Sequence, residues 1–163
     1  MTFLNPETQC RVLAFDPHNP DHTQSFVRLN TQWIEHYFAL EKNDHVIFAD
    51  PQKTIIDKGG MIAMARWEHR IVGTGALMRR ADDIYELARF AVHPEAQNQG
   101  IGRAIADYLL NEARQREISR VFLVTNTKLK AAAALYARLG FVTSRVDLHQ
   151  HYSRANITME KVL

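Results

Sequence analysis

Residues 82–105 hold the feature that most constrains the fold: an apolar run, then a glycine-containing loop, then a helical pattern. The run DDIYELARFAV is apolar on both faces except at Glu86 and Arg89, which is typical of a central, buried strand. After Gly102, apolar residues recur at helical spacing as far as Ala113, and polar residues such as Arg103 face away. A strand, a glycine loop and a helix in this order favour an α/β fold.

The other segments also predict alternating strands and helices. Further strands are expected at 10–15, 120–126, 141–148 and 156–163, with a hairpin over 59–80 whose turn is at 68–70. Further helices are expected at 21–37, between two loops at 42–45 and 49–53, and at 129–139, where Gly140 suits the C-terminal cap. This order predicts a mixed α/β sheet with helices on both faces, in a single domain over residues 1–163.

Composition and charge exclude some classes of protein. With 46% hydrophobic and 23% charged residues, the chain has an ordinary soluble globular composition. The net charge of +2, with basic residues interleaved among acidic ones, argues against a nucleic-acid partner. We find no signal peptide and no apolar run near the ~20 residues that span a membrane, so we expect a cytoplasmic enzyme or binding domain. Cys10 is interpreted as a small apolar strand residue rather than a nucleophile.

The loop that ends at Gly102 has the properties of a phosphate-binding site. The first N–H groups of a helix lack partners, the helix dipole adds about half a positive charge there, and glycine does not block an anion. A Walker-type loop is excluded because Arg103-Ala104 follows Gly102 in place of Lys-Ser/Thr. The dinucleotide fingerprint is excluded because Ile105 stands at its third glycine and no acidic residue lies ~20 residues further on.

A third phosphate motif fits. VHPEAQNQGIG, residues 92–102, resembles the pyrophosphate loop of the GNAT superfamily of N-acetyltransferases, Gln/Arg-x-x-Gly-x-Gly/Ala, with Gln97, Gly100 and Gly102 at the motif positions. LYARLGF, residues 135–141, resembles the tyrosine helix and the Gly-Phe that follow in that superfamily. The sequence departs from the pattern at Asn98, where glycine is commonest, and at Leu129, where many relatives have asparagine. The resemblance implies a mixed, mostly antiparallel central sheet flanked by helices on both faces.

The same resemblance implies acetyl-coenzyme A as the co-substrate. The backbone amides of residues 97–102 would hold its pyrophosphate, and the strand at Val92 would pair with the pantetheine arm. Arg103 would meet a phosphate or lie on a solvated helix face, and Asn126 would replace the asparagine missing at 129. The implied cofactor-binding residues are Phe90, Ala91, Val92, Gln97, Asn98, Gln99, Gly100, Ile101, Gly102, Arg103, Asn126 and Tyr136.

Acetyl transfer to an amine needs a base for the amine proton, a donor to the oxyanion and a donor to the departing thiolate. By resemblance Tyr136 is the donor to the thiolate, although it also fits a core aromatic on its helix, and the N–H of Val92 is the oxyanion donor. Glu86 is the predicted base, because a carboxylate in so apolar a strand is costly without a role or partner. The alternatives are an ion pair of Glu86 with Arg66, Arg79 or Arg89, and direct attack without a dedicated base.

The acceptor site is expected between the early helices and the C-terminal strands. Glu41 could receive an ammonium group and Arg154 a carboxylate, which together would suit an amino-acid-like acceptor; the alternative is that both are solvated. The candidate residues are Tyr37, Phe38, Glu41, Tyr152 and Arg154. The histidines at 18, 22, 149 and 151 complete no set of metal ligands, so no metal is expected.

The sequence therefore predicts an enzyme that moves an acetyl group from acetyl-coenzyme A to a primary amine in a ternary complex. A small-molecule acceptor, amino-acid-like or a polyamine, is favoured. The alternatives are a non-catalytic domain that binds or senses acetyl-coenzyme A, and an acetyltransferase for protein lysines or N-termini. No nucleic acid or membrane is expected as a partner, and a homodimer is a common arrangement for such a domain.

Overall fold

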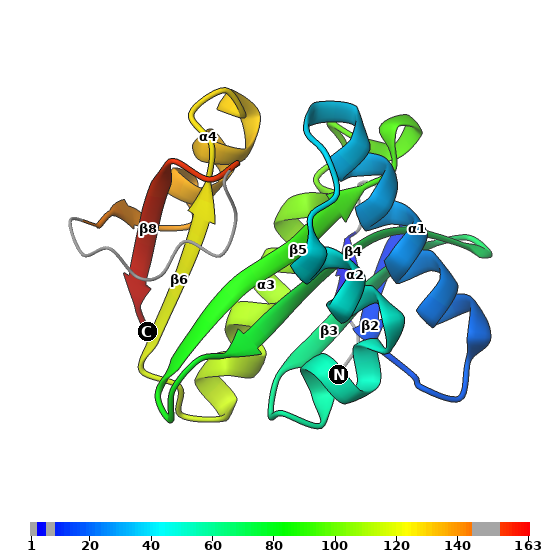
Figure 1. Cartoon of the computed structure of the whole chain (residues 1–163), viewed down its shortest axis with the longest axis horizontal. Coiled ribbons are helices and arrows are strands. Elements are labelled where there is room, and N and C mark those ends of the chain that lie inside the picture. Colours follow the sequence, from blue (N-terminus) through cyan, green and yellow to red (C-terminus); the bar gives the residue numbers. More distant parts are fainter. Residues whose placement is uncertain (1–2, 6–8, 145–153) are drawn as a thin grey trace.

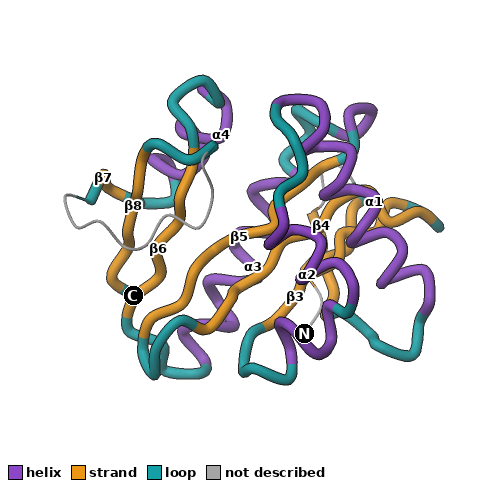
Figure 2. Tube along the Cα trace, viewed as in Figure 1, coloured by secondary structure: helices purple, strands orange, loops and turns teal. Residues whose placement is uncertain are grey.

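The computed structural model of the chain describes residues 3–5, 9–144 and 154–163. In these residues the strands form one sheet with the order β1-β2-β3-β4-β5-β6-β8-β7 (Figures 1 and 2). All neighbours in the sheet are antiparallel except β5 and β6, so the predicted mixed, mostly antiparallel sheet is confirmed. The strands are β1 (Phe3–Asn5), β2 (Cys10–Ala14), β3 (Met61–Trp67), β4 (Arg70–Arg79), β5 (Ile84–Val92), β6 (Arg120–Thr125), β7 (Val142–Thr143) and β8 (Ile157–Val162).

Most of the predicted elements are present. The helices are α1 (Pro20–Tyr37), α2 (Lys42–Ala49), α3 (Ile101–Gln115) and α4 (Lys130–Arg138), with a π-helical turn at Gln52–Ile56 and a 3₁₀ turn at Pro94–Ala96. The loop predicted at 42–45 is wrong, because these residues form the first turn of α2, where the Asp44 side chain accepts from the Glu41 N–H at 2.8 Å. The strand β1 was not predicted, and residues 145–148 of the strand predicted at 141–148 lie outside the described residues.

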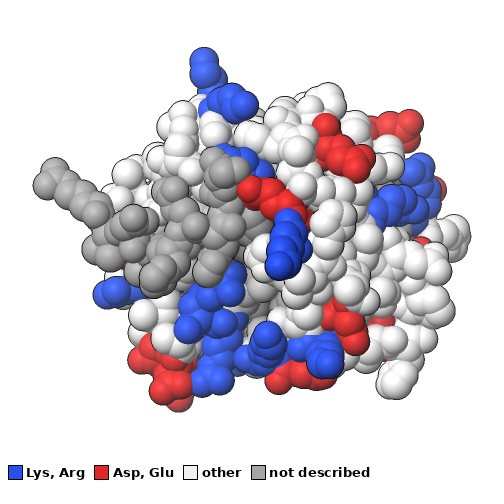
Figure 3. All heavy atoms as spheres, in the orientation of Figure 1, with Lys and Arg blue, Asp and Glu red and all other residues white. Residues whose placement is uncertain are grey.

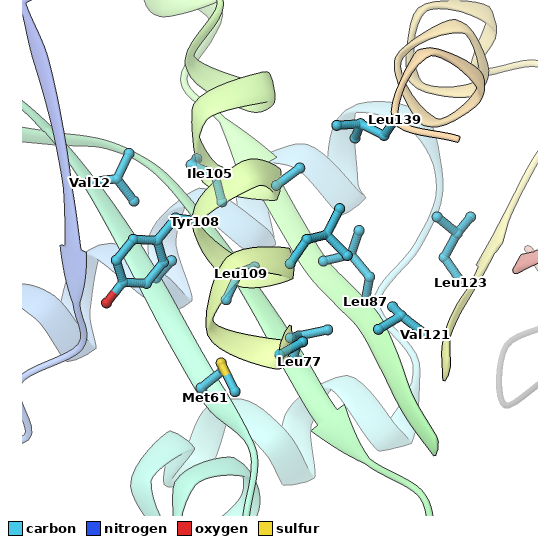
Figure 4. Packing of buried hydrophobic residues seen from close by; sticks show 14 of the residues in the cluster. Val12, Met61, Leu77, Leu87, Ile105, Tyr108, Leu109, Val121, Leu123 and Leu139 are labelled. Carbon is cyan, nitrogen blue, oxygen red and sulfur yellow. The ribbon is translucent and has the colours of Figure 1, made fainter. Parts of the chain in front are cut away.

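Helices cover both faces of the sheet, as predicted. Side chains of β3 point alternately to the two faces. Ala63 and Ala65 pack in one apolar cluster with Ile105 and Leu109 of α3 (Figure 4), and Ile62 and Met64 pack in a second with Phe26 and Leu29 of α1. Ile47 of α2 joins the second cluster, and Leu135 and Tyr136 of α4 pack against the first. The sheet is therefore buried on both sides, which explains its nearly continuous apolar strands.

Two glycines of β4 allow α3 to lie close to the sheet. A Cβ at Gly73 would lie 2.8 Å from Ile105 Cδ1, and a Cβ at Gly75 would lie 2.8 Å from Phe90 Cδ2. Neither position has room for a larger side chain. The N-terminus of α3 is thereby held beside the end of β5.

The sheet divides between β5 and β6. Ladder pairing of the two strands is confined to Ile84–Glu86 against Arg120–Phe122, whereas β5 continues to Val92 and β6 pairs with β8 as far as Thr125 (Figure 1). We call β5 the near arm, and β6 with β8 and the residues from 154 that lead into β8 the far arm. The two arms diverge, and the edge of β5 that faces the far arm is left open.

A β-bulge lies in the open part of β5. Ala88 pairs with Ala76 and Ala91 with Thr74, so Arg89 and Phe90 both oppose Gly75. Arg89 has φ of 56°, which is a sparsely populated conformation for a residue with a side chain. The extra residue turns Phe90 toward the α3 face while Arg89 points toward α2.

The surface and the lone cysteine agree with the sequence analysis where the structure describes them. Lys and Arg side chains are interspersed with Asp and Glu on the face shown in Figure 3. None of the described helices is both long and apolar enough to cross a membrane. Cys10 is completely buried in β2, and this burial raises the pKa of its thiol, so its place in the core is confirmed.

Candidate active site

A groove of about 480 Å³ runs along the open end of β5, the glycine loop and α4. It gathers nearly all of the predicted cofactor-binding residues. Those that line it are Phe90, Ala91, Val92, Gln97, Asn98, Gly100, Ile101, Gly102, Arg103 and Tyr136. Gln99 and Asn126 do not line it. Arg103 was expected either to meet a phosphate or to lie on a solvated helix face. It lines the groove, and it also donates to Asp107 at 3.1 Å on the half-exposed face of α3.

The glycine loop lines the groove with a backbone suited to presenting N–H groups. Asn98 and Gly100 both have left-handed backbones, with φ of 61° and 78°, and Gln99 lies between them. Such alternation turns successive N–H groups toward one side and forms an anion-binding concavity. Gly100 is the N-cap of α3 and supplies no side-chain cap, and the first turn contains no acidic residue. The start of α3 is therefore suited to hold a phosphate.

The open edge of β5 presents a further N–H. The N–H of His93 donates to Val72 O at 2.8 Å, toward β4. Because successive residues of a strand direct their N–H groups to opposite edges, the N–H of Val92 faces the open side. The carbonyl of Val92 also faces that side and accepts from Gln97 Nε2 at 3.2 Å. An extended ligand could add to this edge as an extra strand would.

A smaller cavity of about 110 Å³ lies deeper between the arms. We call it the inner cavity. It shares five lining residues with the groove, namely Trp33, Phe90, Leu129, Ala132 and Tyr136. Its other walls include the polar residues Asn30, Glu86, Arg89, Asn126 and Arg154. The two spaces therefore meet at Tyr136, with a polar wall on the inner side.

Comparison with known proteins identifies this arrangement. The acetyltransferase (GNAT) family profile matches residues 10–141. The chain belongs to the GNAT family.

Relatives within this family act on different acceptors. Over 55 residues the chain is 40% identical to the ribosomal protein bS18-alanine N-acetyltransferase of Escherichia coli, a match covering 34% of this chain and 37% of that protein. Over 72 residues it is 39% identical to the amino-acid acetyltransferase of Mycobacterium tuberculosis, covering 44% of this chain and 38% of that protein. The chain thus spans less than two fifths of the length of these curated relatives.

A solved structure supports the GNAT fold over nearly the whole chain. The GNAT-family acetyltransferase of Staphylococcus aureus superposes with a TM-score of 0.82, covering 94% of this chain and 98% of that one. The two sequences are only 18% identical, so the likeness concerns the fold alone.

Tyr136 of this GNAT domain projects from α4 to the junction of the groove and the inner cavity. Its ring packs edge-on against Phe141, with 6.2 Å between the ring centroids. Burial raises the pKa of the Tyr136 hydroxyl to about 12. The phenol therefore stays protonated at neutral pH and can donate a hydrogen bond, while its ring forms part of the core. The structure is compatible with both roles expected from the sequence.

Glu86 lies in the wall of the inner cavity and is 1% exposed. It is ion-paired, but the predicted partners Arg66, Arg79 and Arg89 are wrong. Arg80 donates to Glu86 Oε1 from Nε at 2.8 Å and from Nη2 at 2.6 Å. The turn after β4 explains this, because the N–H of Arg80 donates to Ile84 O at 2.9 Å and folds the residue back over β5.

Glu41 and Arg154 lie together and bind each other, and their roles toward an acceptor stay predictions. Arg154 donates to Glu41 Oε2 at 3.1 Å and forms a two-pronged pair with Asp44, at 2.9 Å to each oxygen. Arg89 also donates to Asp44. The sequence does not reveal Asp44 as a site residue, because its pattern predicts a loop at 42–45. The only available signal was the position of Asp44 three residues after Glu41, the spacing of a helix N-terminus.

The other predicted acceptor residues are divided between the two spaces. Phe38 lines the inner cavity, and Tyr37, which is 44% exposed, lines the groove. Tyr152 lies outside the described residues. Asn126 lines the inner cavity and not the groove; its Nδ2 donates to Arg154 O at 2.8 Å and its Oδ1 accepts from Lys128 N at 2.9 Å. In the described part of the chain, no three His, Cys, Asp or Glu side chains gather as a metal-binding group.

Proposed function

We propose that this protein transfers the acetyl group of acetyl-coenzyme A to a primary amine by direct attack in a ternary complex. Members of the GNAT family bind acetyl-coenzyme A. The observation that carries the proposal is the meeting of a groove and an inner cavity at Tyr136, with Glu86 in the inner wall. One space fits a long phosphate-bearing thioester and the other fits a small amine, so two substrates can be held together.

The residues then divide the chemistry. The N–H groups around Asn98 and Gly100 bind the pyrophosphate, and the open edge of β5 pairs with the pantetheine arm. The N–H of Val92 donates to the carbonyl oxygen as it gains negative charge. Glu86 accepts the proton that the amine must lose. The nitrogen forms its bond to the acetyl carbon, the carbon–sulfur bond breaks, and the hydroxyl of Tyr136 donates to the departing thiolate.

The acceptor is a small amine, amino-acid-like or a polyamine. The inner cavity, at about 110 Å³, lies below the usual range of ligand pockets, so it admits a small molecule or the end of a larger one. Two guanidinium groups, those of Arg89 and Arg154, lie in its wall. Both groups are paired with the buried Asp44, and Arg154 is also paired with Glu41, so their charges are compensated. Charge in this wall therefore does not favour an amino-acid-like acceptor over a polyamine, and both classes stay candidates.

The test is thiol release from acetyl-coenzyme A with amino acids, polyamines, aminoglycosides and peptides as acceptors, using the native chain and Tyr136→Phe. We expect turnover with small amines, amino-acid-like or polyamine, that is lost in the variant. Turnover with peptides alone would instead support an acetyltransferase for protein N-termini or lysines. Tight binding of acetyl-coenzyme A without turnover across the panel would favour a sensing domain.

A further inference from the structure

The two arms of the sheet are joined beyond their short ladder by one buried carboxylate. Asp44, in the first turn of α2, accepts from Arg154 Nη1 and Nη2 at 2.9 Å each, and also from Arg89 Nη1. The Glu41 N–H gives it a fourth donor, at 2.8 Å. A carboxylate with this many donors is held in a single orientation.

Arg154 belongs to the far arm. Its carbonyl accepts from Asn126 Nδ2 at 2.8 Å, immediately after β6. Two residues later, the N–H of Asn156 donates to Thr125 O at 2.9 Å, and β8 begins at Ile157. A contact that holds the Arg154 side chain therefore also holds the end of the far arm in place.

Arg89 belongs to the near arm, at the bulge of β5. Its backbone, with φ of 56°, is unusual for a residue with a side chain and must be maintained by surrounding contacts. Asp44 holds one end of its guanidinium, and the guanidinium carbon lies 5.2 Å from the centre of the Phe48 ring of α2. The pair with Asp44 therefore helps to fix the bulge and the part of β5 that follows.

The ion pairs of Asp44 with Arg89 and Arg154 are buried, which makes the loss of one partner costly. The side chains of Asp44, Arg89 and Arg154 are 0%, 3% and 14% exposed. Exposed ion pairs contribute little, but removing one member of a buried pair leaves charges without compensation. Loss of the Asp44 charge would leave two guanidinium groups close together between the arms.

We propose that Asp44 is a positioning residue that braces the near arm against the far arm and so fixes the width of the inner cavity. Both of its arginine partners line the inner cavity, and neither lines the groove. The brace therefore acts on the acceptor and leaves the cofactor unaffected. This inference rests on the proposed function only for its kinetic consequence, because the bracing of the arms is a property of the protein without substrates.

The test compares Asp44→Asn with the native chain and with Asp82→Asn, a matched control. Asp82 pairs with a single arginine, Arg79, and its side chain is 96% exposed. Asparagine keeps an oxygen for the Glu41 N–H but loses the charge. We expect the acceptor KM to rise about 10-fold, because the inner cavity is no longer held at the width that fits the acceptor. The kcat and the Kd for coenzyme A should change less than about 2-fold. Asp44→Glu should recover part of the loss.

Hydrogen exchange of the substrate-free protein provides a second readout. In Asp44→Asn, the amides of His93 and Asn156, which donate to Val72 O and Thr125 O at the ends of the two arms, should lose protection together, while those of α3 keep it; Asp82→Asn should change neither. If Asp44→Asn does not fold, Arg154→Lys, which removes the two-pronged pair, is measured in the same way. A fall in kcat at constant acceptor KM, or unchanged exchange at both amides, would overturn the brace. If no amine is acetylated, the proposed function fails, but the exchange result still decides the brace.

Discussion

Arg80 donates to Glu86 from Nε and from Nη2, and both of these hydrogen bonds go to the same oxygen, Oε1. The pair separates two spaces, because Glu86 lines the inner cavity and Arg80 lines a different cavity of about 150 Å³ beside α2. The guanidinium therefore compensates the buried carboxylate from the side away from the substrates. Glu86 can therefore face the inner cavity while it stays paired with Arg80.

Replacing Glu86 by glutamine should abolish its capacity to accept a proton while keeping its size. We expect kcat to fall about 100-fold or more, the usual contribution of a general base, with little change in the Kd for coenzyme A. Glu117→Gln is the control, because Glu117 is an exposed glutamate beyond the C-terminal end of α3 and lines neither the groove nor the inner cavity. Turnover near that of the native chain would remove Glu86 from the mechanism and leave direct attack without a dedicated base.

Tyr136→Phe should remove the donor to the thiolate and keep the ring packed against Phe141. We expect a large fall in kcat with coenzyme A affinity nearly unchanged. Since the pKa of Tyr136 is about 12, ionisation of this hydroxyl should not shape the rate profile between pH 6 and about 10. Steady-state rates of the native chain and the variant over this range provide the measurement. A basic limb below pH 10 that disappears in the variant would contradict this role.

The raised pKa of Tyr136 also predicts how stability depends on alkaline pH. Its folded-state pKa, about 12, lies above the ordinary value of 10.0. The unfolded chain therefore loses this proton first, and the protein loses stability as pH rises from about 10 toward 12. Chemical denaturation at several alkaline pH values should show this loss in the native chain and a smaller one in Tyr136→Phe. Equal pH dependence in the two chains would show that the hydroxyl is not desolvated.

Gly100→Ala should weaken coenzyme A binding. Gly100 has φ of 78°, a backbone conformation that costs a residue with a Cβ about 1–2 kcal/mol. The backbone of the variant would shift to relieve this strain, and the shift would displace the N–H groups around residue 100. A loss of this size corresponds to about a tenfold change in Kd, measurable by calorimetry. Gly59→Ala is the control, because Gly59 has φ of 94° but does not line the groove. Both variants should lose stability, but only Gly100→Ala should lose coenzyme A affinity; an equal Kd in the two would exclude the loop as the phosphate site.

Asp44 should make the protein sensitive to acid. Burial alone would raise the pKa of Asp44, but hydrogen bonds from Arg154, the Glu41 N–H and Arg89 outweigh it and lower the pKa to about 2. The unfolded chain therefore takes up this proton first, so the stabilisation is present above about pH 4 and is lost as pH falls toward 2. Its size is about 2 kcal/mol. The difference in unfolding free energy between the native chain and Asp44→Asn should shrink over this range, and a constant difference would contradict the pairing.

The glycine loop and its flanking elements could be predicted because their evidence is local. Periodicity places α3, and the residues of the loop follow one another in the sequence, so the positions of Gln97, Gly100 and Gly102 were enough to indicate a phosphate site. The buried strand β5 was recognisable for the same reason: its residues face helices on both sides and are therefore apolar throughout.

The polar partnerships could not be predicted because they depend on contacts between distant segments. Asp44 and Arg154 are separated by 110 residues, and no periodic pattern relates them. The Arg80–Glu86 pair depends on how the turn after β4 folds back, which the alternation of residues does not fix. The bulge at Arg89 was also invisible, since an arginine in a strand ordinarily indicates an exposed or paired side chain and not a left-handed backbone.

The order of the strands has a consequence for synthesis of the chain. The strands β3, β4 and β5 are consecutive in sequence and adjacent in the sheet, so each can pair as soon as it leaves the ribosome. The far arm cannot, because β8, the last described strand, lies between β6 and β7. Its ladder forms only after translation has reached residues 157–162. During synthesis, β3–β5 and the glycine loop can therefore be in place before the far wall of the inner cavity exists.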